Sequence, residues 1–293
     1  MDKRMSAAEV VARISDGMTL GIGGWGPRRK PMALIRELLR SPVKDLTVVA
    51  YGGADVGMLC AAGKIRKLVF AFVSLDQIPL EPYFRKARQA GAIEVMELDE
   101  GMVHWGLRAA AMRLPFLPTR CGIGTDIETL NPEIAAIRSP YPDGERLLAM
   151  PALPLDVALC HANRCDEWGN CQILSPDPFF DDLFCRAAKQ AFVSCERVVA
   201  RGALLETGPP QTIWMDRSMV AGVVEIPFGA HPSSNVPDYG IDLPHLQAYG
   251  ASAKSDAGWS EYCRHYVELP NHEAYLEAVG GVEKLAALPA PIF

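Results

Sequence analysis

Two adjacent acids, Asp99 and Glu100, stand between an apolar segment and a glycine in the stretch LDEGM (98–102). A carboxylate in an apolar cleft can serve as a general base, because burial raises its pKa toward neutral pH. Acids at the start of a helix also cap free N–H groups, for about 0.3–1 kcal/mol each. His104 lies four residues after Glu100, on the same helix face, and is a candidate to orient it. Two adjacent acids make one of them redundant for capping, so Asp99 is expected to be the cap, while the residues alone leave both roles open for Glu100.

A glycine-rich loop, GIGGWG (21–26), fits the G-x-G-x-x-G pattern of dinucleotide-binding loops. Two features count against NAD(P): PRRKP (27–31) separates the glycines from the next helix, and the second strand ends in Tyr51-Gly52-Gly53 instead of a ribose-binding acid. Alternatively, Gly23 and Gly24 let backbone N–H groups approach an oxyanion or a thioester carbonyl. The third interpretation is a tight turn without a ligand.

Three basic residues, Arg28, Arg29 and Lys30, follow this loop directly. They are candidates to contact carboxylate or phosphate groups of a ligand, and the alternative is a solvated basic corner. Trp25 packs either against a ligand or in the core. Gly52 and Gly53 are candidate ligand contacts from the second loop.

No metal site is expected. The stretch 161–170 contains His, Cys, Asp and Glu, but its spacing matches no familiar ligand set, and a polar turn explains it more simply. The eight cysteines form no C-x-x-C pair, which indicates buried thiols in a reducing compartment. Ser-His-Asp catalysis is not indicated, because the chain has no G-x-S-x-G.

Short apolar runs alternate with helical patterns through the first hundred residues. Strands are predicted at 18–23, 46–51, 68–75 and 93–98, with helices at 6–14, 31–39, 56–63 and 80–90. Further helices are predicted at 101–113, 180–190, 258–268 and 272–287, and strands at 155–162 and 192–200. The alternation predicts βαβ units and a mostly parallel sheet. We expect one α/β domain over 1–293, with a loop-rich excursion at about 119–150 that could form a flap.

The parallel sheet determines where a ligand should bind. Ligands lie beyond the carboxyl ends of parallel strands, where loops and helix N-termini converge. That rule selects four loops, at 23–26, 52–55, 74–76 and 99–101. Glu100 is therefore expected at the same edge as the glycine-rich loop.

Charge and hydropathy exclude some partners. The 293 residues carry a net charge of −6 and no long run of like charges, so we do not expect nucleic acid as a partner. The apolar run near 68–75 is far shorter than the ~20 residues that cross a bilayer. The first residues contain no uninterrupted apolar segment of a signal peptide. We expect a soluble, cytoplasmic protein without membrane contact.

Five segments, in order, carry a family resemblance: GIGGWGPRRKP (21–31), LTVVAYGG (46–53), GLRAAAMRLPFLPTRCGIGTD (106–126), DVALCHANRCDEWGN (156–170) and VEIPFGAHPSS (224–234). Together they resemble the alpha subunit of class I coenzyme A transferases of the glutaconate CoA-transferase type. The resemblance implies an open three-layer α/β/α fold like that of ribose-5-phosphate isomerase. It also implies a partner beta subunit of the same fold and an acyl-CoA substrate. Coenzyme A would then be part of the substrate and not a cofactor.

Within that family, GWGPRRKPM (24–32), YGGADVGMLCAAGKI (51–65), FVSLD (72–76), ELDEGM (97–102) and DPFFDDLF (177–184) resemble the alpha chains of bacterial cholesterol ring-cleaving hydrolases. This resemblance implies an α2β2 heterotetramer that acts on a CoA thioester and opens the last steroid ring by hydrolysing a C–C bond, in the degradation of steroids of the cholesterol or bile acid type. The acid of the E-G-M motif is the base in that group, which here is Glu100. Arg28, Arg29 and Lys30 would contact a substrate carboxylate or CoA phosphates.

Two alternatives remain open at this point. In a CoA transferase for a dicarboxylic or 3-oxo acid, the nucleophilic glutamate belongs to the beta subunit and Glu100 would be incidental. In a non-catalytic scaffold subunit, the chain would only complete its partner's pocket.

Overall fold

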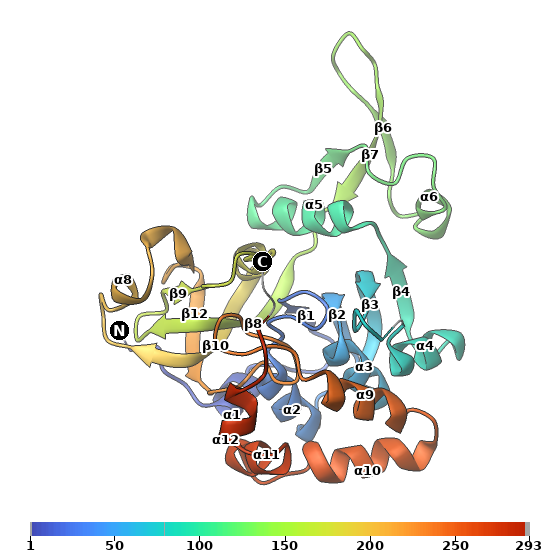
Figure 1. The fold of residues 1–293 in the computed structure, drawn as a ribbon. Helices are drawn as coiled ribbons and strands as arrows, with labels where there is room; N and C mark the ends of the chain where they lie inside the picture. The colour runs from blue at the N-terminus through green and yellow to red at the C-terminus, as the bar shows by residue number, and fades with distance from the viewer. Residues whose placement is uncertain (1, 79, 291–293) are drawn as a thin grey trace.

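The computed structural model describes residues 2–78 and 80–290 and contains a twisted, mostly parallel sheet (Figure 1). Seven parallel strands run in the order β12-β10-β8-β1-β2-β3-β4. They are β1 (Thr19–Ile22), β2 (Leu46–Gly52), β3 (Ile65–Val73), β4 (Glu94–Glu97), β8 (Leu155–Asp166), β10 (Ala188–Val199) and β12 (Val220–Glu225). Two short antiparallel strands, β9 (Cys171–Gln172) and β11 (Ile213–Met215), extend one side. The predicted parallel α/β sheet is confirmed.

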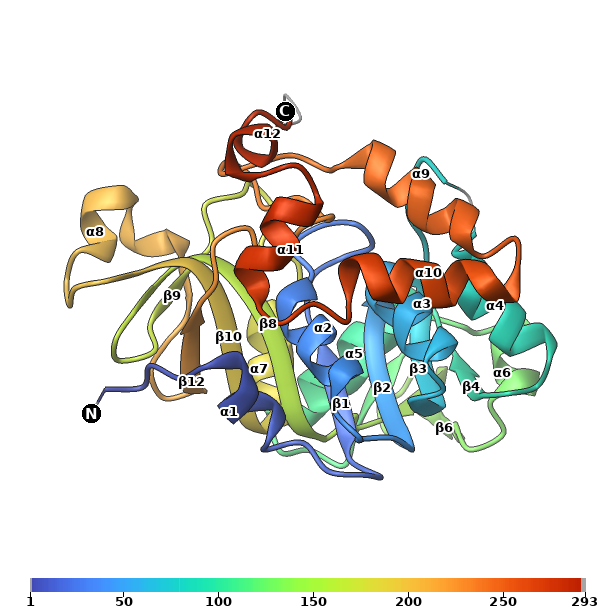
Figure 2. The ribbon, with the colours of Figure 1, turned by 90° about the horizontal axis from the view of Figure 1, so that it is seen from below.

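Helices cover both faces of this sheet (Figures 1 and 2). One face carries α1 (Ala7–Val11), α2 (Met32–Arg40), α3 (Ala54–Ala61) and α4 (Pro82–Gln89), and the other carries α5 (Glu100–Ala111) and α7 (Asp181–Ala187). Successive strand residues point to opposite faces, so Val48 packs in the first layer and Val49 in the second. Both faces are buried, which explains why the strands read as continuous apolar runs. The three-layer α/β/α fold is confirmed.

The C-terminal helices form an outer cover. They are α9 (Leu243–Ser252), α10 (Asp256–Tyr266), α11 (His272–Ala278) and α12 (Val282–Ala286). Tyr249 and Tyr262 of this cover pack against Met58 of α3. The helix predicted at 272–287 is two helices, because Gly280 and Gly281 both adopt positive φ angles, 110° and 87°. The predictions omitted α9.

Residues 119–150 are more ordered than the expected loop-rich excursion. They contribute to a three-stranded antiparallel sheet, β5 (Phe116–Thr119), β7 (Arg146–Pro151) and β6 (Ala136–Arg138), with one turn of helix, α6 (Ile127–Leu130). This segment projects from the body beside α5 (Figure 1). Buried Leu148 and Met150 pack it against the core, and Trp105 Nε1 donates to the Pro118 carbonyl at 2.9 Å. Its role as a flap stays a prediction.

The polar stretch after the fifth predicted strand is partly strand itself. β8 continues to Asp166, and the turn follows it. The Asp166 carboxylate accepts the N–H groups of Trp168 and Asn170 at 3.0 and 2.9 Å, as a turn-forming aspartate does. Two short helical pieces complete the region, α8 (Leu204–Thr207) and the 3₁₀ turn η1 (Pro210–Thr212).

The cysteines are all free thiols, and five of them are buried: Cys160, Cys165, Cys171, Cys185 and Cys195. Cys60 and Cys263 are half-buried, whereas Cys121 is exposed, so the prediction of buried thiols is wrong for that residue. None of the helices among the described residues has the length and apolar character that crossing a membrane requires.

Candidate active site

Glu100 is the first residue of α5, directly after the carboxyl end of β4. Asp99 is the helix cap, because its Oδ1 accepts the Gly101 N–H at 2.7 Å. Within residues 2–78 and 80–290, no hydrogen bond or ion pair uses the Glu100 carboxylate; its backbone carbonyl alone is engaged. The structure therefore agrees with the hypothesis that one of the two acids caps the helix and that the side chain of the other is free.

The electrostatic surroundings of Glu100 suit a base. Partial burial raises the pKa of the Glu100 carboxyl, and the adjacent Asp99 carboxylate raises that pKa further. The side chain nevertheless reaches solvent, since the residue is exposed. A carboxylate that is accessible, unpaired and more basic than usual can accept a proton from water or from a substrate.

Tyr51 links the start of α5 to the second strand. Its hydroxyl donates to the Glu100 carbonyl at 2.9 Å, and burial raises the pKa of this phenol, so it stays a donor. The Trp25 ring stacks on the Tyr51 ring with centroids 4.9 Å apart and an interplanar angle of 19°. The glycine-rich loop and Glu100 thus meet at one edge of the sheet, as predicted from the strand order.

His104 does not orient Glu100 in this structure. Its Nε2 accepts from the Arg108 guanidinium at 3.1 Å, and its ring packs on Phe180 with centroids 4.4 Å apart. Burial and the Arg108 charge both lower the pKa of His104, which leaves it neutral near pH 7. These contacts do not agree with the prediction that His104 orients Glu100. The structure shows the His104 ring packed against Phe180.

The N–H groups of Gly23 and Gly24 are engaged within the chain. Gly23 donates to the Leu159 carbonyl at 2.9 Å, and Gly24 donates to Asp181 Oδ1 at 2.7 Å. This contradicts the expectation that they face an oxyanion or thioester. Gly24 has φ +75°, and a Cβ there would lie 2.5 Å from the Arg28 carbonyl oxygen, so the turn itself requires glycine.

The second glycine pair supports the first loop. Gly53 donates to Asp55 Oδ1 at 2.7 Å, and a Cβ on Gly53 would lie 2.4 Å from the Gly26 carbonyl oxygen. The Gly52 carbonyl accepts the Ser74 N–H at 3.0 Å. Close approach between loops is therefore the observed role of Gly52 and Gly53, and their predicted ligand contact stays a prediction.

The three basic residues differ in exposure. Arg29 is 2% exposed and pairs with Asp181 at 3.2 Å, while Lys30 is 1% exposed and lies 3.2 Å from Asp55. Both contradict the expectation that they contact a substrate carboxylate or CoA phosphates, because each is buried against an internal carboxylate. Arg28 is half-exposed and pairs with Asp76 at 2.5 Å, so its predicted ligand contact stays a prediction.

Glu81 is a further buried carboxylate, close enough to Asp55 for that charge to add to the effect of burial on its pKa. Glu81 caps α4, with its Oε2 accepting the Phe84 N–H at 2.6 Å, and its Oε1 accepts the Tyr249 hydroxyl at 2.7 Å. Burial raises the pKa of Glu81 to about 7. This cluster fastens α9 to the start of α4, and local sequence patterns did not reveal it because its members are far apart in the chain.

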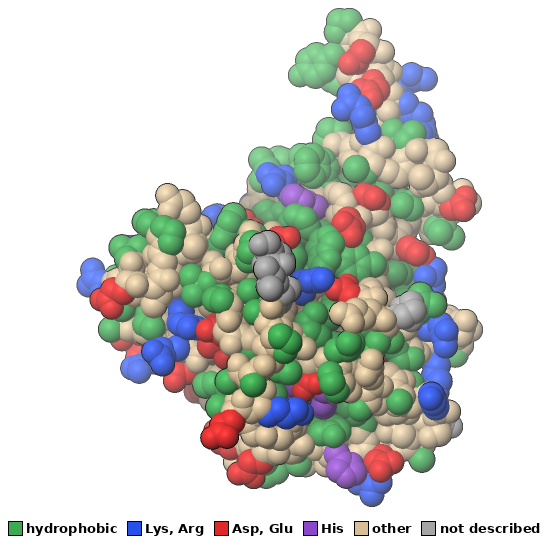
Figure 3. Space-filling model, in the orientation of Figure 1, with side chains coloured by type: hydrophobic (Ala, Val, Ile, Leu, Met, Phe, Trp, Pro, Cys, Tyr) green, Lys and Arg blue, Asp and Glu red, His purple; other side chains and the backbone are tan. Residues whose placement is uncertain are grey.

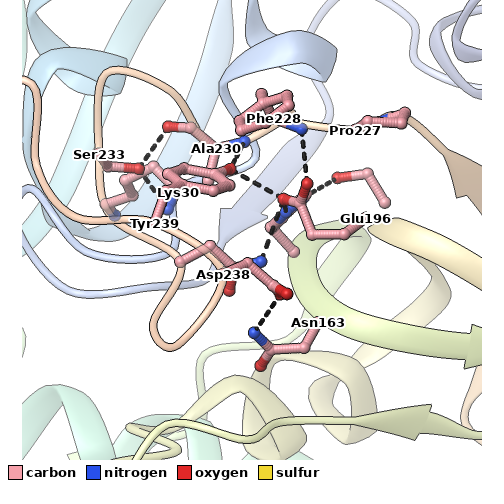
Figure 4. Close-up of polar contacts among 12 residues, drawn as sticks. Lys30, Asn163, Glu196, Pro227, Phe228, Ala230, Ser233, Asp238 and Tyr239 are labelled. Atoms are coloured by element: carbon pink, nitrogen blue, oxygen red, sulfur yellow. Dashed lines mark hydrogen bonds and ion pairs between the residues drawn. The ribbon is translucent and has the colours of Figure 1, made fainter. Parts of the chain in front are cut away.

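Glu196, on β10, was also missed and forms the centre of a polar network (Figure 4). It accepts from the Tyr239 hydroxyl at 2.8 Å, from Asn235 Nδ2 at 3.1 Å and from the Phe228 N–H at 2.5 Å. His161 Nε2 lies 2.7 Å from Glu196. The sequence pattern that could have indicated this network is a charged residue inside the apolar run FVSCERVVA (192–200), because a buried charge needs hydrogen-bond or ionic partners.

This network includes a Ser-His-Glu order that looks like a hydrolase triad. Ser194 Oγ lies 2.8 Å from His161 Nδ1, and His161 contacts Glu196 through its other nitrogen. Ser194 and His161 are both fully buried, however, so no substrate reaches the hydroxyl. The network instead ties the loop after β12 to the strands.

Known proteins are similar to this chain in sequence and in fold. The sequence model described as coenzyme A transferase matches residues 4–226. The chain is 52% identical to the cholesterol ring-cleaving hydrolase IpdA subunit of Rhodococcus jostii, over 91% of this chain and 92% of that one. The crystal structure of glutaconate coenzyme A-transferase from Acidaminococcus fermentans matches with a TM-score of 0.90 and 26% identity, over 98% of this chain and 95% of that one.

A further solved structure is a variant of the decarboxylase AibA/AibB. It matches with a TM-score of 0.76 and 30% identity, over 90% of this chain and 99% of that one. The IpdA relative and the AibA/AibB decarboxylase are both named by their subunits. With the three-layer sheet and the matched sequence over most of its length, this chain belongs to the coenzyme A transferase family.

Proposed function

We propose that this chain is the alpha subunit of a heteromeric hydrolase that acts on a CoA thioester and opens the last steroid ring by hydrolytic C–C cleavage, during degradation of steroids of the cholesterol or bile acid type. The observation that carries the proposal is the free, accessible carboxylate of Glu100 at the carboxyl edge of the sheet, with its raised pKa. Identity of 52% to a cholesterol ring-cleaving hydrolase subunit over nearly the full length of both chains supports it.

The chemistry assigned to Glu100 is general base catalysis on a ring ketone that lies beta to the thioester. The carboxylate takes a proton from water as the water oxygen attacks the ketone carbon. The ring C–C bond then breaks, and its electron pair remains on the carbon next to the thioester as an enolate. Glu100 returns the proton to that carbon, so one water is added and a new carboxylate forms.

The charge that develops on the ketone oxygen needs hydrogen-bond donors. The N–H groups of Gly23 and Gly24 already donate to Leu159 and Asp181. We therefore assign the oxyanion donors to groups outside the glycine-rich loop. Coenzyme A enters as part of the substrate, and the reaction as written needs no cofactor.

The partner is proposed to be a beta subunit of the same fold, in an α2β2 heterotetramer. Two relatives of this chain are named as enzyme subunits, and a solved structure of a related decarboxylase is named by two parts, AibA/AibB, which supports a partner. Eight free thiols suit a reducing compartment, so we propose that the complex acts in the cytoplasm.

The test is a substrate assay on the complex with its beta partner. A CoA thioester with a ring ketone beta to the thioester is expected to gain the mass of one water and a free carboxylate, with CoA still attached. Incubation with labelled free acid is expected to give no labelled acyl-CoA. CoA exchange through a glutamyl–CoA thioester on the beta chain would overturn the proposal and establish a CoA transferase, the alternative that the family membership supports.

A further inference from the structure

The turn after β8 lies far across the sheet from Glu100. Trp168 is in this turn, and Glu100 follows β4, four strands away in the order β8-β1-β2-β3-β4. Neighbouring strands lie about 4.8 Å apart, so roughly 20 Å of sheet separates the two places. Lys and Arg side chains gather on this side of the molecule, around the N-terminal segment, with acids between them (Figure 3). The chemistry proposed for Glu100 does not use this region.

An open cavity of about 430 Å³ is lined here by four residues from three segments of the chain: Lys3, Trp168, Arg217 and Ser218. Two of these side chains are cations, and none of the four is an acid. The guanidinium of Arg217 lies 5.3 Å from the centroid of the half-buried Trp168 ring. The guanidinium of Arg201, in the loop after β10, lies 3.9 Å from the same centroid. Three positive charges therefore lie around one indole ring.

The cations of this cavity keep hydrogen-bond donors free. Lys3 Nζ donates to the carbonyls of Arg217 and Val220, each at 2.5 Å, which leaves one of the three N–H groups of an ammonium unused. Within residues 2–78 and 80–290, the guanidinium groups of Arg201 and Arg217 have neither a hydrogen bond nor an ion pair with another residue. Like charges this close repel each other, and a bound anion would relieve that repulsion.

The acids beside the cavity do not neutralise these cations. Asp216 Oδ1 accepts the N–H and the hydroxyl of Ser218 at 2.7 and 2.5 Å, and its Oδ2 lies 3.9 Å from Arg186. In the described part of the chain, Glu167 also forms no ion pair with the cations around Trp168. The buried Arg29 differs, because its internal carboxylate already satisfies it.

Hydrogen bonds between the three segments fix the backbone beneath the cavity. The Arg217 N–H donates to Asn170 Oδ1 at 3.1 Å, which joins its loop to the turn of Trp168. The Lys3 N–H donates to the Glu167 carbonyl at 2.8 Å, which joins the N-terminal segment to the same turn. A backbone that is already ordered loses less conformational entropy when a ligand binds.

We infer that this cavity binds a free phosphate monoester of about nucleotide size, with its phosphate on Arg217 and Lys3 and its organic part against Trp168. A phosphate monoester carries a charge of about −1.5 to −2 at pH 7 and several acceptor oxygens, which matches cations with unused donors. The planar fork of an arginine suits such an oxyanion. The cavity volume lies within the range of about 300–1,000 Å³ of small-molecule sites, which leaves room for a ring beside the phosphate. The inference does not depend on the proposed ring-cleaving function.

The test is calorimetric titration of the complex with its beta partner, with AMP as the probe and adenosine as its phosphate-free comparison. We expect AMP to bind, and adenosine to bind at least about tenfold more weakly, because it makes no charged hydrogen bonds. Arg217→Gln should raise the Kd of AMP by about tenfold. Arg201→Gln removes a charge that lies on the ring but does not line the cavity, so it should raise that Kd by only about threefold.

Arg85→Gln is the matched control, since Arg85 is an exposed arginine on α4, outside the cavity. It removes the same charge and should leave the Kd of AMP within about twofold, because solvent and salt screen a distant charge. No binding of AMP, equal binding of adenosine, or an equal loss in Arg85→Gln would overturn the site.

Coenzyme A also carries a phosphate monoester, so it is titrated as a second probe. For a free ligand in the cavity, Arg217→Gln should leave the affinity of the complex for coenzyme A unchanged. A Kd for coenzyme A that Arg217→Gln raises by about tenfold would assign the cavity to the nucleotide end of coenzyme A and overturn the inference of a free ligand.

Discussion

Two glutamates near the carboxyl edge of the sheet have opposite surroundings. Glu196 is largely buried and has partners for both oxygens, including Tyr239 and the Phe228 N–H. Glu100 is exposed, and among the described residues its carboxylate has no partner. A carboxylate whose oxygens are satisfied holds loops in place, whereas one left unpaired keeps its lone pairs for a reaction.

The pKa values of the two groups shift in opposite directions. Burial opposes ionisation of Glu196, but its hydrogen bonds and the His161 ring together hold its pKa below the usual range of a glutamate. Burial is also the main influence on Glu100, and there no hydrogen bond opposes it, so its pKa is raised. Hydrogen bonding, more than burial, therefore distinguishes the pKa of the structural carboxylate, Glu196, from that of the proposed base, Glu100.

The largest expected effect comes from removing the proposed base. Glu100→Gln keeps the size of the side chain but cannot accept a proton, so kcat of the complex should fall by about 10²–10⁴-fold. The free energy of unfolding should change by less than about 0.5 kcal/mol, because the carboxylate has no partner to lose among residues 2–78 and 80–290. Steady-state kinetics and urea unfolding measure the two effects.

Glu94→Gln is the control for that variant, since Glu94 is an exposed acid on the preceding strand, β4, paired with Arg66. It should leave kcat unchanged. If Glu100→Gln is as active as Glu94→Gln, the chain is not the source of the base.

The second effect is on stability and concerns Glu196. Glu196→Ala leaves the Tyr239 hydroxyl, the Phe228 N–H and His161 without their acceptor, in a buried place. Breaking such a network should lower the free energy of unfolding by about 3 kcal/mol. Urea unfolding of the complex measures this loss, and a change below about 1 kcal/mol would contradict the structural role.

The pH dependence should separate the two carboxylates. Glu100 works as a base only when ionised, so the rate falls as pH drops through its raised pKa, above the usual range of a glutamate. Glu196 has a lowered pKa, so its contribution to stability is complete above the unfolded value and is lost only as pH falls through the lower folded value. Acidification should therefore stop catalysis before it removes the Glu196 contribution. Activity and unfolding curves on the same samples check the order, and coincident losses would contradict it.

The sequence predicted the parts of the site that depend on neighbouring residues. The cap at Asp99, the free acid at Glu100 and their place after β4 follow from local pattern and strand order. The roles of Arg29 and Glu196 were not predictable in this way, because their partners are distant along the chain. Asp181 lies 152 residues from Arg29, and Tyr239 lies 43 residues from Glu196. In the sequence, a basic run next to a glycine-rich loop has the pattern of an anion-binding site. Only the structure shows that Arg29 in this run pairs with an internal carboxylate, Asp181.

The smallest expected effect tests whether Asp99 tunes Glu100 as well as capping α5. Asn caps a helix about as well as Asp, so Asp99→Asn should keep the hydrogen bond to the Gly101 N–H and cost at most about 1 kcal/mol of stability. It removes the negative charge that raises the pKa of Glu100. The acid limb of kcat/KM should therefore move to lower pH, because a less basic Glu100 stays ionised further down. Asp99→Ala removes charge and cap together, so it should show the same shift with a larger stability loss. An acid limb that stays in place in Asp99→Asn would mean that burial alone sets the basicity of Glu100.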